Sequence, residues 1–394
     1  MAAAEQLPEL VRNAVAVLPE GELERKLALG RPLRVKLGID VTAPDIHVGH
    51  AIPLQRMAAF QRQGHVGVLI IGDCTTRIGD PSGRSAERPI LSDAEIDRNA
   101  KTYLEQAAQI LDTDPARLEV RFNGEWLSRL DFAETIRLTR TMTVARLLER
   151  DDFAKRYAEG QPISVSELLY PLMQAYDSVA VRADVELGGT DQHYNLLAGR
   201  DVMAAYGLDP QVALTTPLLL GTDGRKMSAS LGNYIGLREP PEEQFGKTMR
   251  ISDGLLPDYY RLVMESTVDP TKVDPLEAKL ELARFIVRRS HGEAAAAAAE
   301  AHFTRVVREG EAPEEVREIR VAATDGTVYL PGILVDHFGV PSTSEGRRLI
   351  AQGGVRLDGD VVSEFEVPAT RVDGALLQAG KRRFARILIA EAIP

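Results

Sequence analysis

The first part of the chain alternates between short apolar runs and one longer periodic stretch. An apolar run from Leu33 to Ile39 is followed by a turn rich in Asp, Thr and Pro. The next stretch, from near His47 to about Gln63, has the spacing of a helix, and a second apolar run extends from Val66 to Ile71. This order and length are typical of a parallel strand–helix–strand crossover, so the pattern predicts an α/β nucleotide-binding fold.

The following segment has helical periodicity. Ser92 and Glu95 have the spacing of a capping box, which predicts a helix that runs to about Leu111. The apolar positions also predict a helix from Phe132 to Leu148.

Strand-like runs return around Val185 and Leu218. The residues from about 85 to 180 are therefore expected to be a helical insertion within one α/β domain that spans residues 1–239.

The character of the chain changes at Pro240, where helical stretches are separated by prolines. We expect an α-helical domain over residues 240–320. It includes an alanine-rich run from Glu293 to Ala301, and alanine has the highest intrinsic helix propensity. The Glu-rich stretch from Gly310 to Glu318 contains a proline and predicts a linker.

A small separate α+β module is expected over residues 327–394. Its predicted elements are two helices and two short strand-like pieces around a turn: Gly332–Phe338, Ser344–Gln352, Val355–Leu357 and Val361–Val362.

Composition agrees with a folded protein of two or three domains, because 44% of the 394 residues are hydrophobic and 27% are charged. The single cysteine, Cys74, permits no intrachain disulfide and no cysteine zinc site, which fits a reducing compartment. The N-terminus lacks the pattern of a signal peptide, and no apolar run approaches the roughly 20 residues of a membrane span. We expect a cytoplasmic protein with no membrane partner.

The formal net charge of −11 argues against nucleic-acid binding over the whole surface, because phosphates are bound mainly through Lys and Arg. Two local basic clusters remain, and they are Lys381–Arg386 and the set Arg284, Arg288 and Arg289. Each cluster is also compatible with a solvated face. RNA is therefore expected to be held only at selected places, and no DNA partner is expected.

The strongest local motif runs from Gly38 to His50, after a predicted strand and at a predicted helix start. Free N–H groups and a partial positive charge at a helix N-terminus favour a triphosphate. His47 and His50 lie on one helical face and can donate hydrogen bonds to a phosphate, while Gly49 leaves room for a nucleotide. The two histidines alone could also be a metal pair or two exposed residues.

A second motif, from Gly224 to Ser230, lies in a loop of small residues after the strand expected to end at Leu220. A mobile loop that carries Lys226 could close on a pyrophosphate group and stabilise it as it leaves. A single Lys-Met-Ser sequence could also be an ordinary surface turn.

Together the two motifs resemble the HIGH and KMSKS signatures of class I aminoacyl-tRNA synthetases. The resemblance implies a Rossmann-type catalytic domain with a helical insertion, ATP with Mg²⁺ as a substrate complex, and no structural metal. It implies that His47, His50 and Lys226 are catalytic. The implied ATP-binding residues are Asp40, Thr42, Gly49, Gly189, Asp191, Met227, Ser228 and Ser230.

Two other segments, Tyr170–Asp177 and Gly188–Gln192, resemble bacterial tyrosyl-tRNA synthetases. Tyr170, Gln174 and Asp177 are four and three positions apart, which places them on one helical face. Without the resemblance, Tyr170 could be a core residue and Asp177 a solvated one.

The resemblance implies that Asp177 accepts a hydrogen bond from the substrate phenol. Tyr170 and Gln174 would bind the substrate ammonium together with Asp80, and Gln192 would lie at the substrate carbonyl. The ribose hydroxyls would meet Gly189 and Asp191.

Three positions depart from the family pattern. Ala229 stands where a second lysine is usual, which predicts slower activation unless Arg225 or a bound cation compensates. Lys36 stands where many relatives have a tyrosine that contacts the phenol, so tyrosine recognition would depend more on Asp177. Pro53 cannot supply the hydroxyl that some relatives offer to the nucleotide.

The segment from Gly346 to Gly359 resembles an S4 RNA-binding domain. The expected RNA-binding residues are Arg347, Arg348, Arg356, Lys381, Arg382 and Arg383. Arg347 and Arg348 could also be a plain solvated pair. The family resemblance implies tRNA(Tyr), ATP and L-tyrosine as partners, and a homodimer formed through the inserted helices.

Three alternatives remain at this point. The chain could be an RNA-binding protein on a retired synthetase scaffold, which Ala229 alone supports. It could be an adenylate-forming ligase that ignores tRNA, although the S4-like tail argues against this. A tryptophanyl enzyme is the third alternative, and Asp177 argues against it.

Overall fold

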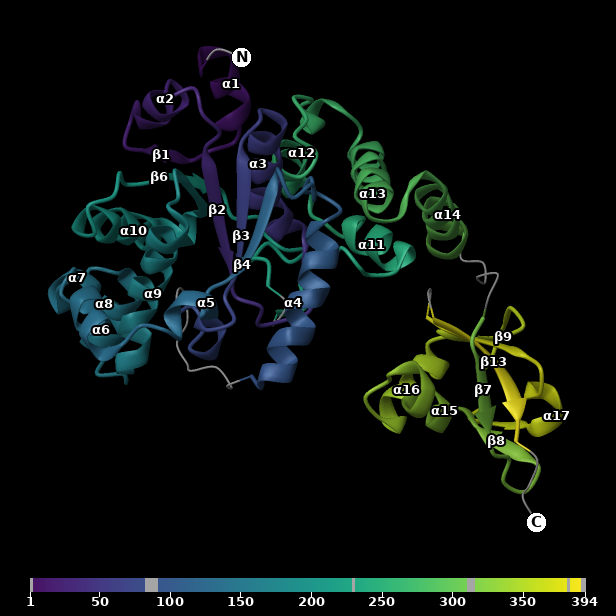
Figure 1. Cartoon of the computed structure of the whole chain (residues 1–394). Coiled ribbons are helices and arrows are strands. Elements are labelled where there is room, and N and C mark those ends of the chain that lie inside the picture. The colour runs from purple at the N-terminus through teal and green to yellow at the C-terminus, as the bar shows by residue number, and fades with distance from the viewer. Residues whose placement is uncertain (1–2, 82–90, 229–230, 310–315, 381–382, 391–394) are drawn as a thin grey trace. The chain divides into compact units, whose positions relative to one another are not determined.

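The computed structural model describes residues 3–81, 91–228, 231–309, 316–380 and 383–390. The chain divides into two compact units, Met1–Ser290 and His291–Pro394 (Figure 1). Each unit has its own hydrophobic core, so each is described separately.

The first unit is built on a six-stranded sheet with the order β1-β6-β5-β2-β3-β4. Neighbouring strands are parallel except β1, which pairs antiparallel with β6. The strands are β1 (Ala16–Leu18), β2 (Arg34–Ile39), β3 (Val66–Ile71), β4 (Leu118–Phe122), β5 (Val185–Gly189) and β6 (Val212–Thr216). The chain builds outward from β2 to β4 and then returns to the other side of β2 with β5, so the strand order reverses between β2 and β5.

Helices cover both faces of this sheet (Figure 1), which fits the unbroken apolar sequence of β3. Val35 and Leu69 belong to a core that also contains residues of α3 (Val48–Arg62). On the other face, Val68 and Ile70 pack with Val181 at the end of α9 (Val165–Val181).

Further helices of the first unit precede and connect these strands. They are α1 (Ala3–Leu10), α2 (Glu22–Leu27), α4 (Asp93–Ala107), α5 (Gly124–Leu127), α6 (Phe132–Thr139), α7 (Val144–Leu147), α8 (Asp151–Ala158) and α10 (His193–Ala205). Helix α4 begins with the predicted capping box, in which the Ser92 N–H donates to Glu95 at 2.8 Å.

Three expectations about this region were wrong. The single helix expected from Phe132 to Leu148 is broken into α6 and α7, because the Thr143 side chain accepts a hydrogen bond from the Arg146 N–H and starts a new helix. The region expected to be wholly helical contains β4, which pairs with β3. The strand expected near Leu218 lies earlier, at β6, and only an isolated bridge joins Leu220 to Lys226.

Three helices of the first unit follow Pro240, and they are α11 (Pro241–Thr248), α12 (Leu256–Leu262) and α13 (Pro275–His291). Helices α12 and α13 pack into the same core as the sheet. Tyr259 and Tyr260 of α12 are fully buried members of that core. The compact unit therefore continues past residue 239, and a functional division at 239 stays a prediction.

The second unit begins near α14 (Glu293–Phe303) and contains a five-stranded sheet with the order β10-β9-β12-β13-β7 and a two-stranded sheet, β11-β8. Its strands are β7 (Glu318–Val321), β8 (Thr327–Tyr329), β9 (Val355–Leu357), β10 (Asp360–Val361), β11 (Glu366–Pro368), β12 (Leu376–Ala379) and β13 (Arg383–Ile389). Its other helices are α15 (Leu330–Phe338), α16 (Thr343–Ala351) and α17 (Ala369–Val372). Six residues of the expected linker, 310–315, lie outside the described part of the chain.

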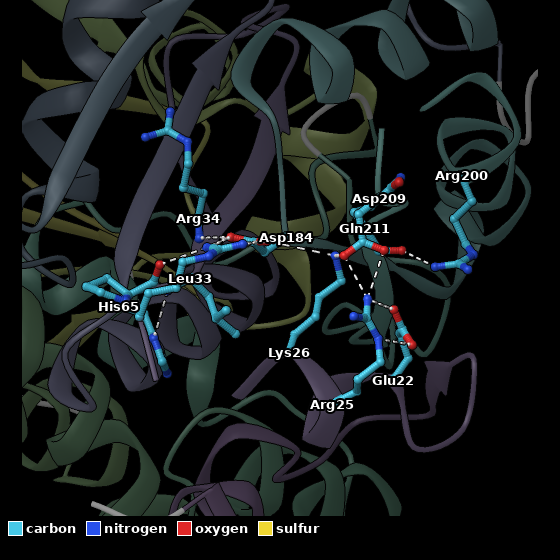
Figure 2. A network of polar contacts seen from close by, with 12 residues as sticks. Glu22, Arg25, Lys26, Leu33, Arg34, His65, Asp184, Arg200, Asp209 and Gln211 are labelled. Atoms are coloured by element: carbon cyan, nitrogen blue, oxygen red, sulfur yellow. Dashed lines mark hydrogen bonds and ion pairs between the residues drawn. The ribbon is translucent and has the colours of Figure 1, made fainter. Parts of the chain in front are cut away.

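A polar network joins the amino ends of the parallel strands in the first unit (Figure 2). The buried Lys26 ammonium lies 3.0 Å from Asp209 and 3.8 Å from Asp184. Asp184 accepts two hydrogen bonds from Arg31, each 2.7 Å long, and a third from the Arg34 N–H. This network stabilises the amino ends of the parallel strands. The candidate site lies at their opposite, carboxyl ends.

Candidate active site

The candidate site lies at the carboxyl ends of β2 and β5, where the strand order reverses. In open α/β sheets such a switch point opens a crevice that binds ligands. Strand β2 leads into Asp40 and the turn that contains Thr42, and β5 ends at Gly189. Both predicted nucleotide segments therefore reach the same edge of the sheet.

The first signature forms the start of α3. His47 is its N-cap residue, and the Val48 N–H donates to the Ile235 carbonyl at 3.0 Å. The rings of His47 and His50 are stacked, with centroids 3.7 Å apart and planes at 16°. The two imidazoles thus point the same way at the first turn of a helix, as their spacing predicted.

Both histidines are held in the neutral form. Burial, with smaller effects of His50 and Lys226, lowers the pKa of His47 well below its usual value. The His50 ring still has an exposed surface, yet crowding by surrounding protein atoms, together with Lys226, lowers its pKa to about 4. Asp191 acts against that shift. Near neutral pH each ring can therefore donate one hydrogen bond without carrying a charge.

Gly49 lies between the two signatures. A Cβ atom there would lie 3.0 Å from His47 Nδ1, which is a tight contact, and 3.5 Å from Met227 Sδ. Met227 itself is buried beside α3. Segments far apart in the sequence are thus in contact at Gly49.

The second signature presents Lys226 to the site. Its ammonium lies 2.7 Å from Asp191 Oδ2, and both side chains are partly exposed. Asn233, which the sequence did not single out, fixes the loop by accepting from the Ser228 N–H at 2.9 Å and donating to the Lys226 carbonyl at 3.1 Å. Ala229 and Ser230 lie outside the described residues.

A residue expected to bind tyrosine is hydrogen-bonded directly to a residue expected to bind ATP. The Tyr170 hydroxyl donates to Asp40 Oδ2 at 2.9 Å, and Thr75 donates to the other oxygen at 2.7 Å. Burial and the nearby carboxylates raise the pKa of Tyr170 well above its usual value. Tyr170 therefore remains a neutral donor between the two predicted subsites.

Asp177 is buried, and its carboxylate accepts hydrogen bonds from two donors that no sequence motif indicated. The Trp126 indole donates to Oδ1 at 2.8 Å, and the Asn123 amide donates to Oδ2 at 3.3 Å. Burial raises the pKa of Asp177 to about 7, against the lowering effects of Lys36, Trp126 and Asn123. Asp177 is thus not a solvated helix residue.

Asp80 and Gln192 also meet. The Gln192 amide donates to Asp80 Oδ2 at 2.7 Å, and its own oxygen accepts from Asn195 at 3.0 Å. Arg150 lies 3.8 Å from Asp80 and is itself buried. No sequence motif indicated Arg150 or Asn195, because neither residue lies within a recognised pattern.

Other predicted residues take the following places. Thr42 is half-buried in the turn after β2. A Cβ at Gly189 would lie 2.7 Å from Asp191 Oδ1, so a side chain there would displace that carboxylate. Lys36 is fully buried against Glu186 at 2.9 Å.

The predicted RNA-binding arginines that the structure describes belong to the second unit and are exposed. Arg347 donates to the Tyr329 hydroxyl at 2.8 Å, Arg348 pairs with Glu345 at 2.6 Å, and Arg356 donates to the Gly359 carbonyl at 2.9 Å. Arg383 begins β13, whereas Lys381 and Arg382 lie outside the described residues. The exposed guanidinium groups are therefore held by local contacts.

No group of three or more His, Cys, Asp or Glu side chains in the described part of the chain could hold a metal ion. No helix within the same ranges is long and apolar enough to cross a membrane.

Comparison with known proteins agrees with this geometry. Residues 28–308 match the family model described as "tRNA synthetases class I (W and Y)". The chain therefore belongs to this family of class I aminoacyl-tRNA synthetases.

Curated relatives indicate the amino acid. The tyrosine–tRNA ligase of Geobacter sulfurreducens is 49% identical, over 99% of this chain and 100% of that protein. The tyrosine–tRNA ligase of Thermotoga maritima is 47% identical, over 97% of each chain.

Solved structures share the fold. A tyrosyl-tRNA synthetase of Archaeoglobus fulgidus in complex with L-tyrosine has a TM-score of 0.62 and 24% identity, and it covers 74% of this chain and 99% of its own. A C-terminally truncated mitochondrial tyrosyl-tRNA synthetase of Aspergillus nidulans has a TM-score of 0.62 and 24% identity, with 76% and 92% covered.

Proposed function

We propose that this protein is a tyrosine–tRNA ligase, which activates tyrosine with ATP and transfers it to the 3′ end of tRNA(Tyr). One observation carries the proposal. The face of α9 with Tyr170 and Asp177 lies at the same carboxyl ends of the strands as the two signatures, and the hydrogen bond from Tyr170 to Asp40 connects them. An amino-acid pocket and a nucleotide site therefore adjoin.

In the first step, a carboxylate oxygen of tyrosine attacks the α-phosphorus of ATP. The new P–O bond forms as the bond to the bridging oxygen breaks, and pyrophosphate leaves with its Mg²⁺. The neutral rings of His47 and His50 donate hydrogen bonds to the phosphate oxygens, where charge develops. Lys226 exchanges Asp191 for the departing pyrophosphate.

In the second step, a hydroxyl of the terminal ribose of the tRNA attacks the tyrosyl carbonyl carbon and gives up its proton. The bond from that carbon to the oxygen of the phosphate breaks, and AMP leaves with this oxygen. Neither step needs a side chain as nucleophile. Catalysis consists mainly of positioning and of electrostatic stabilisation by fixed donors.

Selection of tyrosine depends on Asp177, whose carboxylate would accept the phenol hydrogen. Trp126 and Asn123 support this assignment because they hold the carboxylate in one orientation. A phenylalanine side chain would bring no donor for the acceptor site that the phenol hydrogen fills, and a missing hydrogen bond of this kind costs roughly 10⁴ to 10⁵ in specificity.

Binding of tRNA is assigned to the parts after residue 239. We propose that residues 240–320 act in anticodon recognition and that residues 327–394 form the S4-like RNA-binding domain. The exposed Arg347, Arg348 and Arg356 support the second assignment. We further propose that the enzyme acts in the cytoplasm.

A homodimer formed through the inserted helices is also part of the proposal. Several large apolar side chains of this region are exposed, and they include Phe132, Ile136, Val144, Tyr157 and Val165. Phe132 is 80% exposed and Val165 is 73% exposed, which is unfavourable unless another surface covers them.

The decisive experiment has two parts: tyrosine-dependent exchange of pyrophosphate into ATP, followed by charging of tRNA(Tyr). We expect both with tyrosine and neither with phenylalanine or tryptophan. Absence of exchange with all twenty amino acids would favour a retired scaffold. Exchange without charging would favour a ligase that does not use tRNA.

A further inference from the structure

A buried ion pair lies behind the pocket and takes no part in the steps above. Lys36 on β2 and Glu186 on β5 are register partners in neighbouring strands, and their side chains are 0% and 1% exposed. The Lys36 ammonium donates to Glu186 Oε1 at 2.9 Å and to two groups of α9, the Gln174 carbonyl and the Ser178 hydroxyl, each at 2.8 Å. All three of its hydrogens are thereby used.

Both oxygens of the Glu186 carboxylate accept hydrogen bonds. Besides Lys36, its Oε1 accepts from the Gln174 side-chain amide at 3.3 Å. Its Oε2 accepts from Ser178 at 2.9 Å and from Gln211 at 2.8 Å. Gly199 makes room for this arrangement, since a Cβ there would lie 2.3 Å from the Gln211 amide nitrogen.

These contacts determine which way the Gln174 amide is turned. A carboxylate can accept hydrogen bonds but cannot donate them, so the nitrogen of the amide must face Glu186. The amide oxygen is then the free end. It is buried and receives no hydrogen bond from the described residues. Because a buried acceptor without a donor is unfavourable, this oxygen is suited to a ligand that brings a donor.

We propose that Glu186, held in place by Lys36, is a positioning residue that keeps the oxygen of the Gln174 amide available to the ammonium group of the substrate. The inference rests on the proposed function, which places the tyrosine ammonium at Gln174. With the opposite orientation, the amide would present its NH₂ group to a cation that has only donors. The ion pair would therefore set the polarity of the ammonium subsite.

A purely structural role would have a different signature. Buried ion pairs can often be replaced by apolar residues of similar volume without loss of stability. A structural defect would weaken every ligand of the pocket, whereas loss of amide orientation would weaken only ligands that carry an ammonium group.

The test uses the full-length Glu186→Gln variant and two probes, tyrosine and 3-(4-hydroxyphenyl)propionate, which has the phenol and the carboxylate but no ammonium. The new amide can donate to Gln174 Oε1 and so release the fixed orientation. We expect the KM for tyrosine in pyrophosphate exchange to rise roughly tenfold, in line with loss of a hydrogen bond to a charged group. The Ki of the propionate as an inhibitor should change less than twofold.

Gln211→Met is the matched control, because it removes a donor to the other oxygen of the same carboxylate and does not touch Gln174. It should leave the tyrosine KM and the propionate Ki within twofold of the unmodified protein. Equal weakening of both probes by Glu186→Gln, or no weakening of tyrosine, overturns the inference.

If Glu186→Gln does not fold, the double variant Lys36→Met with Glu186→Leu replaces the whole pair by apolar side chains. It should show the same selective loss of tyrosine, and an unchanged tyrosine KM in this variant overturns the inference. Absence of tyrosine-dependent exchange in the unmodified protein is a separate outcome, since it overturns the proposed function itself.

Discussion

Asp177 shows how one residue can carry both recognition and pH dependence. Its pKa, about 7, lies above the usual value for Asp because the carboxyl group is buried, while Lys36 and Glu186 exert opposing charge effects. A raised pKa means that this group stabilises the folded chain at low pH and that the contribution is lost as the pH rises through about 7. Binding of the substrate phenol is instead favoured at higher pH, because the ionised carboxylate of Asp177 accepts the phenol hydrogen.

We therefore predict that the KM for tyrosine in pyrophosphate exchange falls as the pH rises from about 6 to 8. Trp126→Phe removes a donor that lowers the pKa of Asp177, so the midpoint of this pH profile should move to higher pH. The KM for ATP serves as the internal control and should not follow the same profile. A tyrosine KM that is constant over this range would contradict the assignment of Asp177.

His50 should contribute mainly to the transition state of activation. We predict that His50→Ala lowers kcat of tyrosine activation by an amount equivalent to about 3 kcal/mol, with little change in the KM for ATP. His50→Gln keeps an N–H donor and should lose less. Single-turnover measurement of adenylate formation separates this step from product release, and equal effects of both variants would argue against a hydrogen-bond donor role.

The sequence indicates candidate site residues where they lie close together in a motif. His47 and His50 share one helical turn, and Tyr170 and Asp177 share one face of α9, so spacing and resemblance single them out as candidates. Trp126 and Asn233 could not be found this way, because each is a lone polar residue that reaches the site only through the tertiary fold. The role of Lys36 was likewise hidden, since its partner Glu186 lies on a different strand.

At the scale of elements, the arrangement of the strands at their amino ends depends on charged residues that no sequence motif indicates. Asp184 is 5% exposed and joins Arg31, the backbone of β2 and the buried Lys26 ammonium. Loss of one partner from a buried ionic network leaves another charge without compensation, and this typically costs about 3–5 kcal/mol.

Asp184→Asn should accordingly lower the free energy of unfolding by about 3 kcal/mol in urea denaturation. The matched control is Glu119→Gln. It breaks an ion pair between the partly exposed carboxylate of Glu119 on β4 and the side chain of Arg34 on β2. That pair should contribute at most about 1 kcal/mol. Similar losses for the two variants would show that burial of Asp184 has no special energetic role.

Prediction of elements from sequence was accurate where the pattern was long and apolar. The limits of β3 agree with the run from Val66 to Ile71, because both faces of that strand are covered. Strand β4 was missed because it is a short edge strand whose side chains are only partly buried, so its alternation is weak. The break between α6 and α7 was missed because one cap, Thr143, interrupts an otherwise continuous apolar period.

For the whole molecule, the separate cores of the two units suggest that activation and RNA binding can be altered independently. The residues that we propose for tyrosine activation belong to the first unit. The arginines assigned to RNA lie in the second unit, where their guanidinium groups are exposed. Substitutions there should therefore affect charging without affecting pyrophosphate exchange.

We predict that Arg347→Gln and Arg356→Gln each raise the KM for tRNA(Tyr) several-fold and leave tyrosine-dependent exchange unchanged. Each lost phosphate contact should also reduce the slope of log affinity against log salt by roughly 0.7 to 0.9. Arg371→Gln is the matched control, because Arg371 is an exposed arginine of the same unit that pairs with Glu364 at 3.3 Å. Since it removes the same charge elsewhere, equal effects of all three variants would indicate a general charge effect rather than defined phosphate contacts.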